Sequence, residues 1–290
     1  MNIREQVSLL GPRKSLVGIL AQPASGSTSV DMPAAVILNA GIIHRIGPNR
    51  MFVDLARILA AAGYPAIRFD LSGIGDSAPR PDVLAPLDAS LADIREALDS
   101  LEASRGIHKV ILIGLCSGAD HAIIYAAQDP RVTGVVLIDP SVPRTWRYYR
   151  NHYWGRLFRL RSWLNFATGR HVVWSRLRRS VQTYKEPKSR GAAPDLQSPQ
   201  VRRFLEDVYA RALAANINML AVFTGDRESQ HNYREQLLHA FPGLCFDGRL
   251  KLEYFGNTDH TFTPEADRRT LVQMIRDWTI ELGGRPGAAA

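Results

Sequence analysis

The sequence predicts an α/β fold in which a mostly parallel sheet is covered by helices on both faces. Short apolar runs such as Ala34–Leu38 and Val110–Gly114 lack the alternation of a half-exposed strand, so we expect strands buried on both sides. Stretches with helical spacing separate these runs, which favours right-handed parallel crossovers. The 290-residue chain is also long enough to bury one substantial core.

The elements can be assigned in order along the chain. Val7–Leu10 and Leu16–Ala21, joined by a turn that contains Gly11 and Pro12, predict a hairpin. The strands expected after it are Ala34–Leu38, Pro65–Phe69, Val110–Gly114, Gly134–Ile138, Asn218–Phe223 and Leu250–Phe255. The helices expected are Arg50–Ala62, Leu87–Ala103, Ala119–Gln128, Tyr233–Phe241 and Glu265–Leu282.

The alternation of strands and helices stops after Pro140 and resumes near residue 216. We therefore expect a core formed by residues 1–140 and 216–290, with residues 141–215 inserted as a helical cap or lid. Aromatic residues are frequent in this insertion, and Trp146, Tyr149 and Tyr153 are candidate substrate-binding residues. Their more ordinary role would be to pack the cap onto the core.

Much of the net charge of +8 falls between Arg144 and Arg190, where Glu186 is the single acidic residue. This stretch is either a solvated basic surface or a surface for an anionic ligand, an acidic partner protein or an anionic membrane. No nucleic-acid-binding module accompanies the charge, so nucleic acid is not expected as a partner. Binding to a membrane surface through this basic, aromatic insertion is the weakest alternative. No apolar run approaches the length of a membrane span.

The sequence lacks a secretory signal and the motifs of metal or nucleotide binding. The N-terminus lacks the apolar stretch of a secretory signal, which favours a cytoplasmic protein whose two cysteines, Cys116 and Cys245, are thiols. The sequence contains no metal-ligand spacing and no glycine-rich nucleotide motif, so neither a metal nor another cofactor is expected.

The segment from Ile111 to Ala119 is an apolar strand, a tight turn and the start of a helix. Gly114 and Gly118 flank Cys116 at two residues on each side, as a sharp strand-to-helix turn requires. A thiol at a helix N-terminus is more readily ionised and is well placed for nucleophilic attack. Ser117 could not replace it, because Leu115 would then occupy a position that needs a small residue. The alternative is a buried core cysteine beside a glycine turn.

The partners of a cysteine nucleophile should follow later strands. His260 lies in the loop after the expected strand Leu250–Phe255 and is the candidate base, whereas His231 is interpreted as a surface or lid residue. For the acid that orients the imidazole we favour Glu228, with Asp226 second and Asp139 third.

Backbone amides should stabilise the oxyanion of the acyl-transfer intermediate. We expect the amide of Ile42, after the Ala34–Leu38 strand, and the amide of Ser117 to serve as donors. Gly41 would let a substrate carbonyl approach closely, and His44 is a further substrate-binding candidate. The alternative for this loop is a plain turn.

With these features, the chain resembles the α/β-hydrolase superfamily over nearly its whole length. Asp70–Ser77 is similar to the D-x-x-G-x-G-x-S stretch of that superfamily, and Gly114–Gly118 resembles the G-x-C-x-G turn of its cysteine-nucleophile, dienelactone-hydrolase-like branch. The chain departs from that branch in its large basic insertion and in Ala40-Gly41, where histidine-glycine is usual. The resemblance implies the fold and a nucleophile–acid–histidine triad, and it leaves the substrate open.

The sequence thus predicts an enzyme that cleaves a small-molecule ester or thioester through an acyl-enzyme on Cys116. Two alternatives stay open. One is an acyltransferase that passes the acyl group to an amine or alcohol, with coenzyme A or an acidic acyl carrier protein as the donor. The other is a non-catalytic ligand-binding protein, since fold alone does not fix function.

Overall fold

The computed structural model describes residues 3–24, 32–157, 195–227 and 230–284. Within these residues one sheet has eight strands in the order β1-β2-β4-β3-β5-β6-β7-β8. The strands are β1 (Ile3–Leu10), β2 (Leu16–Pro23), β3 (Ala34–Ile37), β4 (Ala66–Phe69), β5 (Val110–Leu115), β6 (Val132–Ile138), β7 (Asn218–Thr224) and β8 (Leu250–Phe255). The pairs β1–β2 and β2–β4 are antiparallel, and all other neighbouring pairs, from β4 to β8, are parallel. This arrangement confirms the predicted α/β fold.

The central strands are buried on both sides, as their unbroken apolar sequences predict. Every residue of β3 and β5 is buried, and β5 lies between β3 and β6 in parallel register. Because β3, β5, β6, β7 and β8 all run in the same direction, their carboxyl ends meet at one edge of the sheet. The loops that follow Leu115, Ile138, Thr224 and Phe255 therefore converge there.

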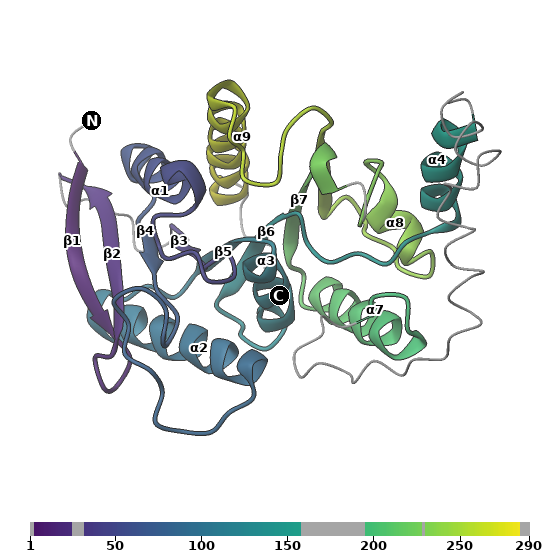
Figure 1. The fold of residues 1–290 in the computed structure, drawn as a ribbon. Coiled ribbons are helices and arrows are strands. Elements are labelled where there is room, and N and C mark those ends of the chain that lie inside the picture. Colours follow the sequence, from purple (N-terminus) through teal and green to yellow (C-terminus); the bar gives the residue numbers. More distant parts are fainter. Residues whose placement is uncertain (1–2, 25–31, 158–194, 228–229, 285–290) are drawn as a thin grey trace.

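Helices cover the two faces of this sheet (Figure 1). One face is covered by α2 (Pro86–Arg105), α3 (Ser117–Ala126) and α7 (Pro199–Ala214), with the short α8 (Gln236–Ala240) packed on the same core cluster. The other face carries α1 (Met51–Ala61), which follows the single turn η1 (Pro48–Arg50), and α9 (Glu265–Gly283). Each covering helix presents an apolar stripe to the sheet, so the core consists of two layers separated by the strands.

The position of α7 corrects the expected boundary of the insertion. Leu205, Val208 and Tyr209 of α7 are buried in the same core cluster as α2 and α3. Residues 199–214 are thus the crossover between β6 and β7 and belong to the core rather than to a cap. The sequence alone could not separate a crossover helix from a cap helix, because both have an amphipathic pattern. Residues 158–194, the greater part of the expected cap, lie outside the described residues.

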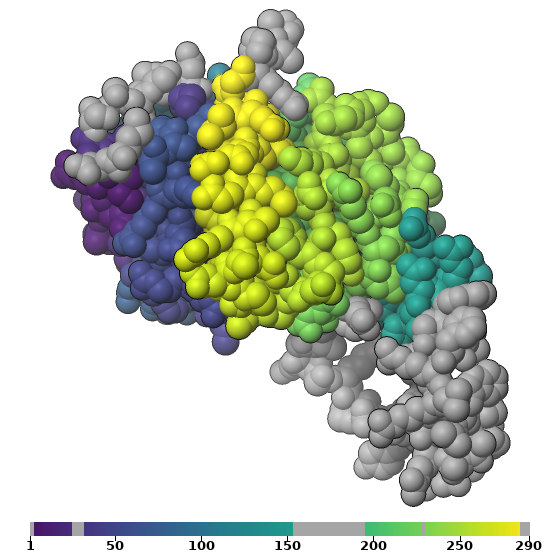
Figure 2. All heavy atoms as spheres, turned by 90° about the horizontal axis from the view of Figure 1, so that it is seen from above, coloured from purple at the N-terminus to yellow at the C-terminus, as the bar shows by residue number. Residues whose placement is uncertain are grey.

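The helix α4 (Trp146–Leu157) begins a few residues after β6 and lies at one end of the molecule (Figures 1 and 2). Its first turn is attached to the core through Tyr148, which is buried and whose carbonyl accepts a hydrogen bond from Asn232 Nδ2 at 3.0 Å. The Arg147 guanidinium lies 4.6 Å from the ring centre of Tyr233. Across the described part of the chain, none of the helices has the length and apolar character of a membrane span.

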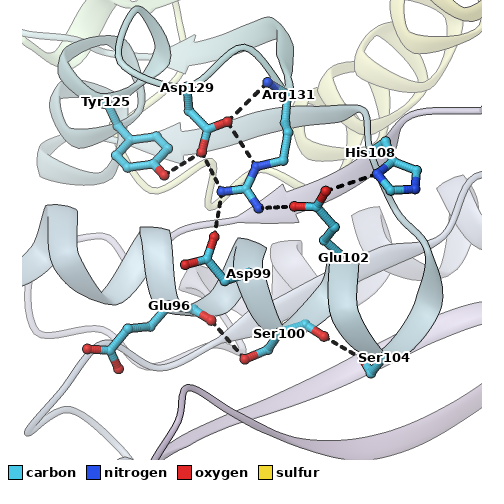
Figure 3. A network of polar contacts seen from close by, with 9 residues as sticks. All are labelled: Glu96, Asp99, Ser100, Glu102, Ser104, His108, Tyr125, Asp129 and Arg131. Atoms are coloured by element: carbon cyan, nitrogen blue, oxygen red, sulfur yellow. Dashed lines mark hydrogen bonds and ion pairs between the residues drawn. The ribbon is translucent and has the colours of Figure 1, made fainter.

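A charged network ties α2 to the start of β6, at the edge of the sheet opposite the converging loops (Figure 3). Arg131 donates to Asp129, Asp99 and Glu102 at distances of 2.6 to 2.8 Å, and the hydroxyl of Tyr125 donates to Asp129 at 2.7 Å. Burial opposes ionisation of Asp129, but these hydrogen bonds outweigh it and lower the pKa of Asp129 to about 2. The network therefore stabilises the fold at the end away from the functional loops.

Replacing Arg131 with Met is expected to lower the free energy of unfolding by about 3 kcal/mol, because it leaves the nearly buried Asp129 carboxylate without its cation. The folded pKa of Asp129 is about 2 against an ordinary value of 3.8. The contribution is thus complete above pH 3.8 and fades as the pH falls towards 2. Urea denaturation at pH 7 measures the effect. The exposed Arg211→Met variant serves as control, and an equal loss in both variants would contradict the assignment.

Candidate active site

The turn around Cys116 has the tight geometry that its sequence predicts. Cys116 joins β5 directly to α3 with φ 55° and ψ −119°, a left-handed backbone conformation that is strained for a residue with a side chain. A Cβ atom added to Gly114 would lie 2.1 Å from the carbonyl carbon of Gly118. One added to Gly118 would lie 2.4 Å from the carbonyl oxygen of Asn39. The two glycines therefore permit the turn that presents Cys116 at the N-terminus of α3.

Replacing Gly114 with Ala is expected to lower the free energy of unfolding by about 1–3 kcal/mol, because the added methyl group must push the α3 backbone away from β5. Gly243→Ala is the matched control, since its Cβ would have Glu206 Oε1 as its nearest neighbour at an ordinary 3.5 Å. Urea midpoints of the two variants test the difference. A Gly114→Ala protein as stable as the control would show that the turn is not tightly packed.

His260 reaches Cys116 from the loop after β8. The side chain of Asp259 accepts hydrogen bonds from the backbone amides of Thr261 at 2.8 Å and Thr263 at 3.2 Å, which fixes the course of this loop. Phe262, fully buried, anchors its other side. His260 lies close enough to Cys116 to lower the pKa of its thiol, and its Nδ1 lies 2.6 Å from Oδ2 of Asp139. The imidazole thus connects the thiol to a carboxylate.

That carboxylate is Asp139, which directly follows β6 and is 1% exposed. Thr224, the last residue of β7, donates to it from its amide at 2.8 Å and from its hydroxyl at 2.6 Å. Nε2 of the buried His231 lies 3.1 Å from Oδ1 of Asp139, without the alignment of a hydrogen bond. Burial opposes ionisation, but the two imidazoles and Thr224 outweigh it and hold the pKa of Asp139 below its ordinary value.

The order of preference among the three acids is therefore corrected. Asp226, the second choice from sequence, lies on the single turn η2 (Gly225–Arg227) and is exposed, and among the described residues it forms no hydrogen bond or ion pair with His260. Glu228, the first choice, lies outside the described residues. Asp139, the third choice, is the carboxylate bonded to His260. Both β6 and β7 end beside the histidine loop, so position along the chain alone does not decide between them.

The electrostatic environment favours charge separation between Cys116 and His260. Hydrogen bonding from His260 lowers the pKa of the Cys116 thiol; burial works against this shift and Arg227 adds to it. Burial disfavours the imidazolium, but Asp139 and Cys116 outweigh it and raise the pKa of His260 to about 9. The thiolate and the imidazolium therefore stabilise each other near neutral pH.

Arg227, which no sequence pattern distinguishes, contacts both Cys116 and His260. Its Nη2 donates to Sγ of Cys116 at 2.9 Å and lies 3.0 Å from Nε2 of His260. The loops after β7 and β8 approach each other closely: a Cβ added to Gly225 would lie only 1.9 Å from the carbonyl oxygen of Gly256. The only sequence signal for a role of Arg227 was its position next to Asp226, in the loop that was expected to supply the acid.

The loop after β3 contributes a hydrogen bond that differs from the expected oxyanion site. The amide of Gly41, rather than that of Ile42, donates to the turn around Cys116, and its acceptor is Oγ of Ser117 at 2.8 Å. The Ile42 side chain is 93% exposed. The amide of Ser117 opens α3 and is one of the first-turn amides that a helix leaves without an internal acceptor. The expected pair, Ile42 and Ser117, stays a prediction; the Gly41 amide already donates to Ser117 Oγ and so is not a free oxyanion donor in this arrangement.

The remaining substrate-binding candidates are dispersed. His44 is exposed in the loop after β3, and Trp146 at the start of α4 is 81% exposed. Tyr149 is half-buried and contacts Tyr148, with the ring centres 5.3 Å apart. The side chain of Tyr153 lies outside the described residues. His231, expected at the surface, is instead fully buried beside Asp139; nothing in its local sequence distinguishes it from an exposed histidine.

The fold and the cysteine–histidine–aspartate arrangement at the carboxyl edge of the sheet define the class as that of the α/β hydrolases. Residues 32–217, more than half of the chain, match the family model described as serine aminopeptidase, S33, and the chain belongs to this family. The family description names serine, whereas the residue at the tight turn between β5 and α3 of this chain is Cys116. Among curated proteins, none matches this sequence.

Solved structures share the fold over almost the whole chain. Dienelactone hydrolase from Anabaena variabilis covers 97% of this chain and 99% of its own, with 13% identity and a TM-score of 0.58. The esterase domain of a Rhodothermus marinus protein covers 98% and 100%, with 17% identity and a TM-score of 0.55. Est1E from Butyrivibrio proteoclasticus, solved with ferulic acid, covers 92% and 95%, with 14% identity and a TM-score of 0.59. The predicted α/β-hydrolase fold is confirmed, whereas the cysteine-nucleophile branch stays a prediction.

Proposed function

We propose that this protein hydrolyses a small-molecule ester or thioester through an acyl-enzyme on Cys116, with His260 as base and Asp139 as the acid that orients it. The observation that carries the proposal is the chain of contacts from Asp139 through His260 to a cysteine in a strained turn. A core cysteine would need neither the turn nor an imidazole held by a buried carboxylate. The esterase and dienelactone hydrolase names of the structural neighbours are consistent with this class of reaction.

The reaction begins with attack of the Cys116 thiolate on the substrate carbonyl. The new S–C bond forms as the carbonyl electrons move to oxygen, and amides at the start of α3 and in the loop after β3 stabilise the oxyanion. Collapse of this intermediate breaks the acyl–O or acyl–S bond and leaves a thioester on Cys116; His260, when protonated, gives its proton to the departing alcohol or thiol and so becomes neutral. Neutral His260 then takes a proton from water, which attacks the thioester and releases the acid and the thiolate. Asp139 holds the Nδ1–H of His260, so that Nε2 faces the reacting atoms.

Intact mass spectrometry after mixing with acyl-pantetheine thioesters and activated esters tests the proposal. Wild type is expected to gain the mass of one acyl group, and Cys116→Ala to gain none. Adding an amine or alcohol in place of part of the water shows which acceptor removes the acyl group, and hence whether the enzyme also transfers it. Absence of both adduct and turnover across the panel would favour the non-catalytic, ligand-binding alternative.

A further inference from the structure

We infer that Arg227 is a permanent counter-ion of the Cys116 thiolate, and that it adapts the site to acyl donors whose leaving group departs without a proton, namely thioesters and aryl esters rather than alkyl esters. This inference rests on the proposed function, because it names the donor class for the same nucleophile. Arg227 lies in the loop after β7, from which an acid was expected to reach the site.

The position of Arg227 is fixed from several sides. Its carbonyl oxygen accepts hydrogen bonds from the amides of Gln230 at 2.7 Å and His231 at 3.0 Å, so the backbone that carries the side chain is anchored. Nη2 then lies 2.9 Å from Sγ of Cys116, the distance of a direct hydrogen bond to sulfur. A guanidinium keeps its charge throughout the working pH range of an enzyme.

The charges around the sulfur leave the Arg227 cation available to it. Cys116 faces His260 from the β8 loop and Arg227 from the β7 loop, while Asp139 lies behind His260. Asp120 of α3 acts on Arg227 only at longer range, and burial raises the pKa of this carboxyl. Among the described residues no carboxylate forms an ion pair with Arg227, and its Nε has no hydrogen-bond partner there. The sulfur is therefore the anion that this guanidinium contacts.

A counter-ion that cannot lose its proton separates ionisation of Cys116 from protonation of His260. In a thiolate–imidazolium pair alone, the thiolate loses its positive partner when the histidine deprotonates. Here the thiolate retains Arg227, whose N–H also faces Nε2 of the neutral imidazole at 3.0 Å. Attack can therefore proceed with a neutral His260, which then has no proton to give to the leaving group.

The identity of the leaving group decides whether that state is productive. A thiol has a pKa of about 8.5, so a thiolate is expelled directly and takes up its proton from solvent afterwards. An aryloxide behaves similarly, since a phenol has a pKa of about 10. An alkoxide is far more basic and needs a proton from His260 as it departs. In each case the acyl–O or acyl–S bond breaks as its electron pair leaves with the departing group, and water later supplies the oxygen and protons of the products.

The first test measures ionisation of Cys116 directly. In a Cys245→Ala background, which leaves one thiol, the rate of alkylation by iodoacetamide is followed against pH for wild type, Arg227→Met, Arg227→Lys and the remote control Arg211→Met. We expect the midpoint of Arg227→Met to lie about one pH unit higher, which corresponds to alkylation about tenfold slower at pH values well below the wild-type midpoint. Arg227→Lys should fall between, and Arg211→Met should match wild type. An unchanged midpoint in a folded Arg227→Met protein would overturn the role of Arg227.

The second test needs no variant and therefore holds even if Arg227→Met fails to fold. A pantetheine thioester and an ethyl ester of the same acid are compared by kcat/KM from pH 6 to 10. The ethyl ester is expected to lose activity above about pH 9, where His260 loses its proton, whereas the thioester is expected to keep a plateau. Equal high-pH losses for both would overturn the donor class. Failure of the proposed function is distinguishable, because then no acyl adduct forms on Cys116 with either donor.

Discussion

Replacing Cys116 with Ala is expected to reduce kcat/KM towards an ester or thioester by at least about 10⁴-fold, because no other described side chain occupies the strained turn beside His260. The amides predicted to bind the oxyanion and the rest of the proposed site would remain, so weak binding without an acyl adduct should persist. Steady-state kinetics combined with intact mass spectrometry give both readouts.

The second cysteine supplies the matched control for this experiment. Cys245 is an exposed free thiol beside Asp247, and Cys245→Ala should retain wild-type activity within about twofold. Cys116→Ser adds a stricter comparison. A hydroxyl is much harder to ionise than a thiol, so the serine protein should depend more strongly on His260 as base. Turnover that survives in Cys116→Ala would remove Cys116 from the mechanism.

Replacing Asp139 with Asn is expected to lower kcat/KM by about 10⁴-fold. An amide in this position would allow the wrong tautomer of His260 and would no longer stabilise the imidazolium. The pKa of His260, which Asp139 raises against the effect of burial, should fall from about 9. A nuclear magnetic resonance titration of His260 and the kinetics of the same protein provide independent measurements.

Asp226→Asn distinguishes the two strands that could supply the acid. Asp226 is exposed on η2, so its variant should keep kcat/KM within about threefold of wild type. Because Asp139 also accepts two hydrogen bonds from Thr224, the urea midpoint of Asp139→Asn should be measured in parallel, so that a loss of stability is not mistaken for a loss of chemistry. A large effect of Asp226→Asn with a small effect of Asp139→Asn would reverse the assignment.

Local sequence predicted the fold class and two members of the proposed triad, Cys116 and His260. Unbroken apolar strands predict a sheet covered on both faces, and the small residues around Cys116 predict the tight turn, because both depend on contacts between near neighbours in the chain. The loop that carries His260 was identified in the same way, as the segment after the last strand. The boundary of the insertion was not, because the burial of α7 depends on its packing against α3 and the sheet.

Only the tertiary structure decided which side chains meet at the carboxyl edge of the sheet. Asp139, Asp226 and Arg227 all follow parallel strands that end side by side, so their order in the chain does not determine which of them faces His260. Asp139 turns inwards with a positive φ of 47° and is held by Thr224 of the neighbouring strand, whereas Asp226 turns outwards on η2. The burial of His231 beside Asp139 and the contact of Arg227 with Cys116 likewise depend on segments that follow different strands. Such contacts are set by the packing of whole elements, and no local pattern in the sequence encodes them.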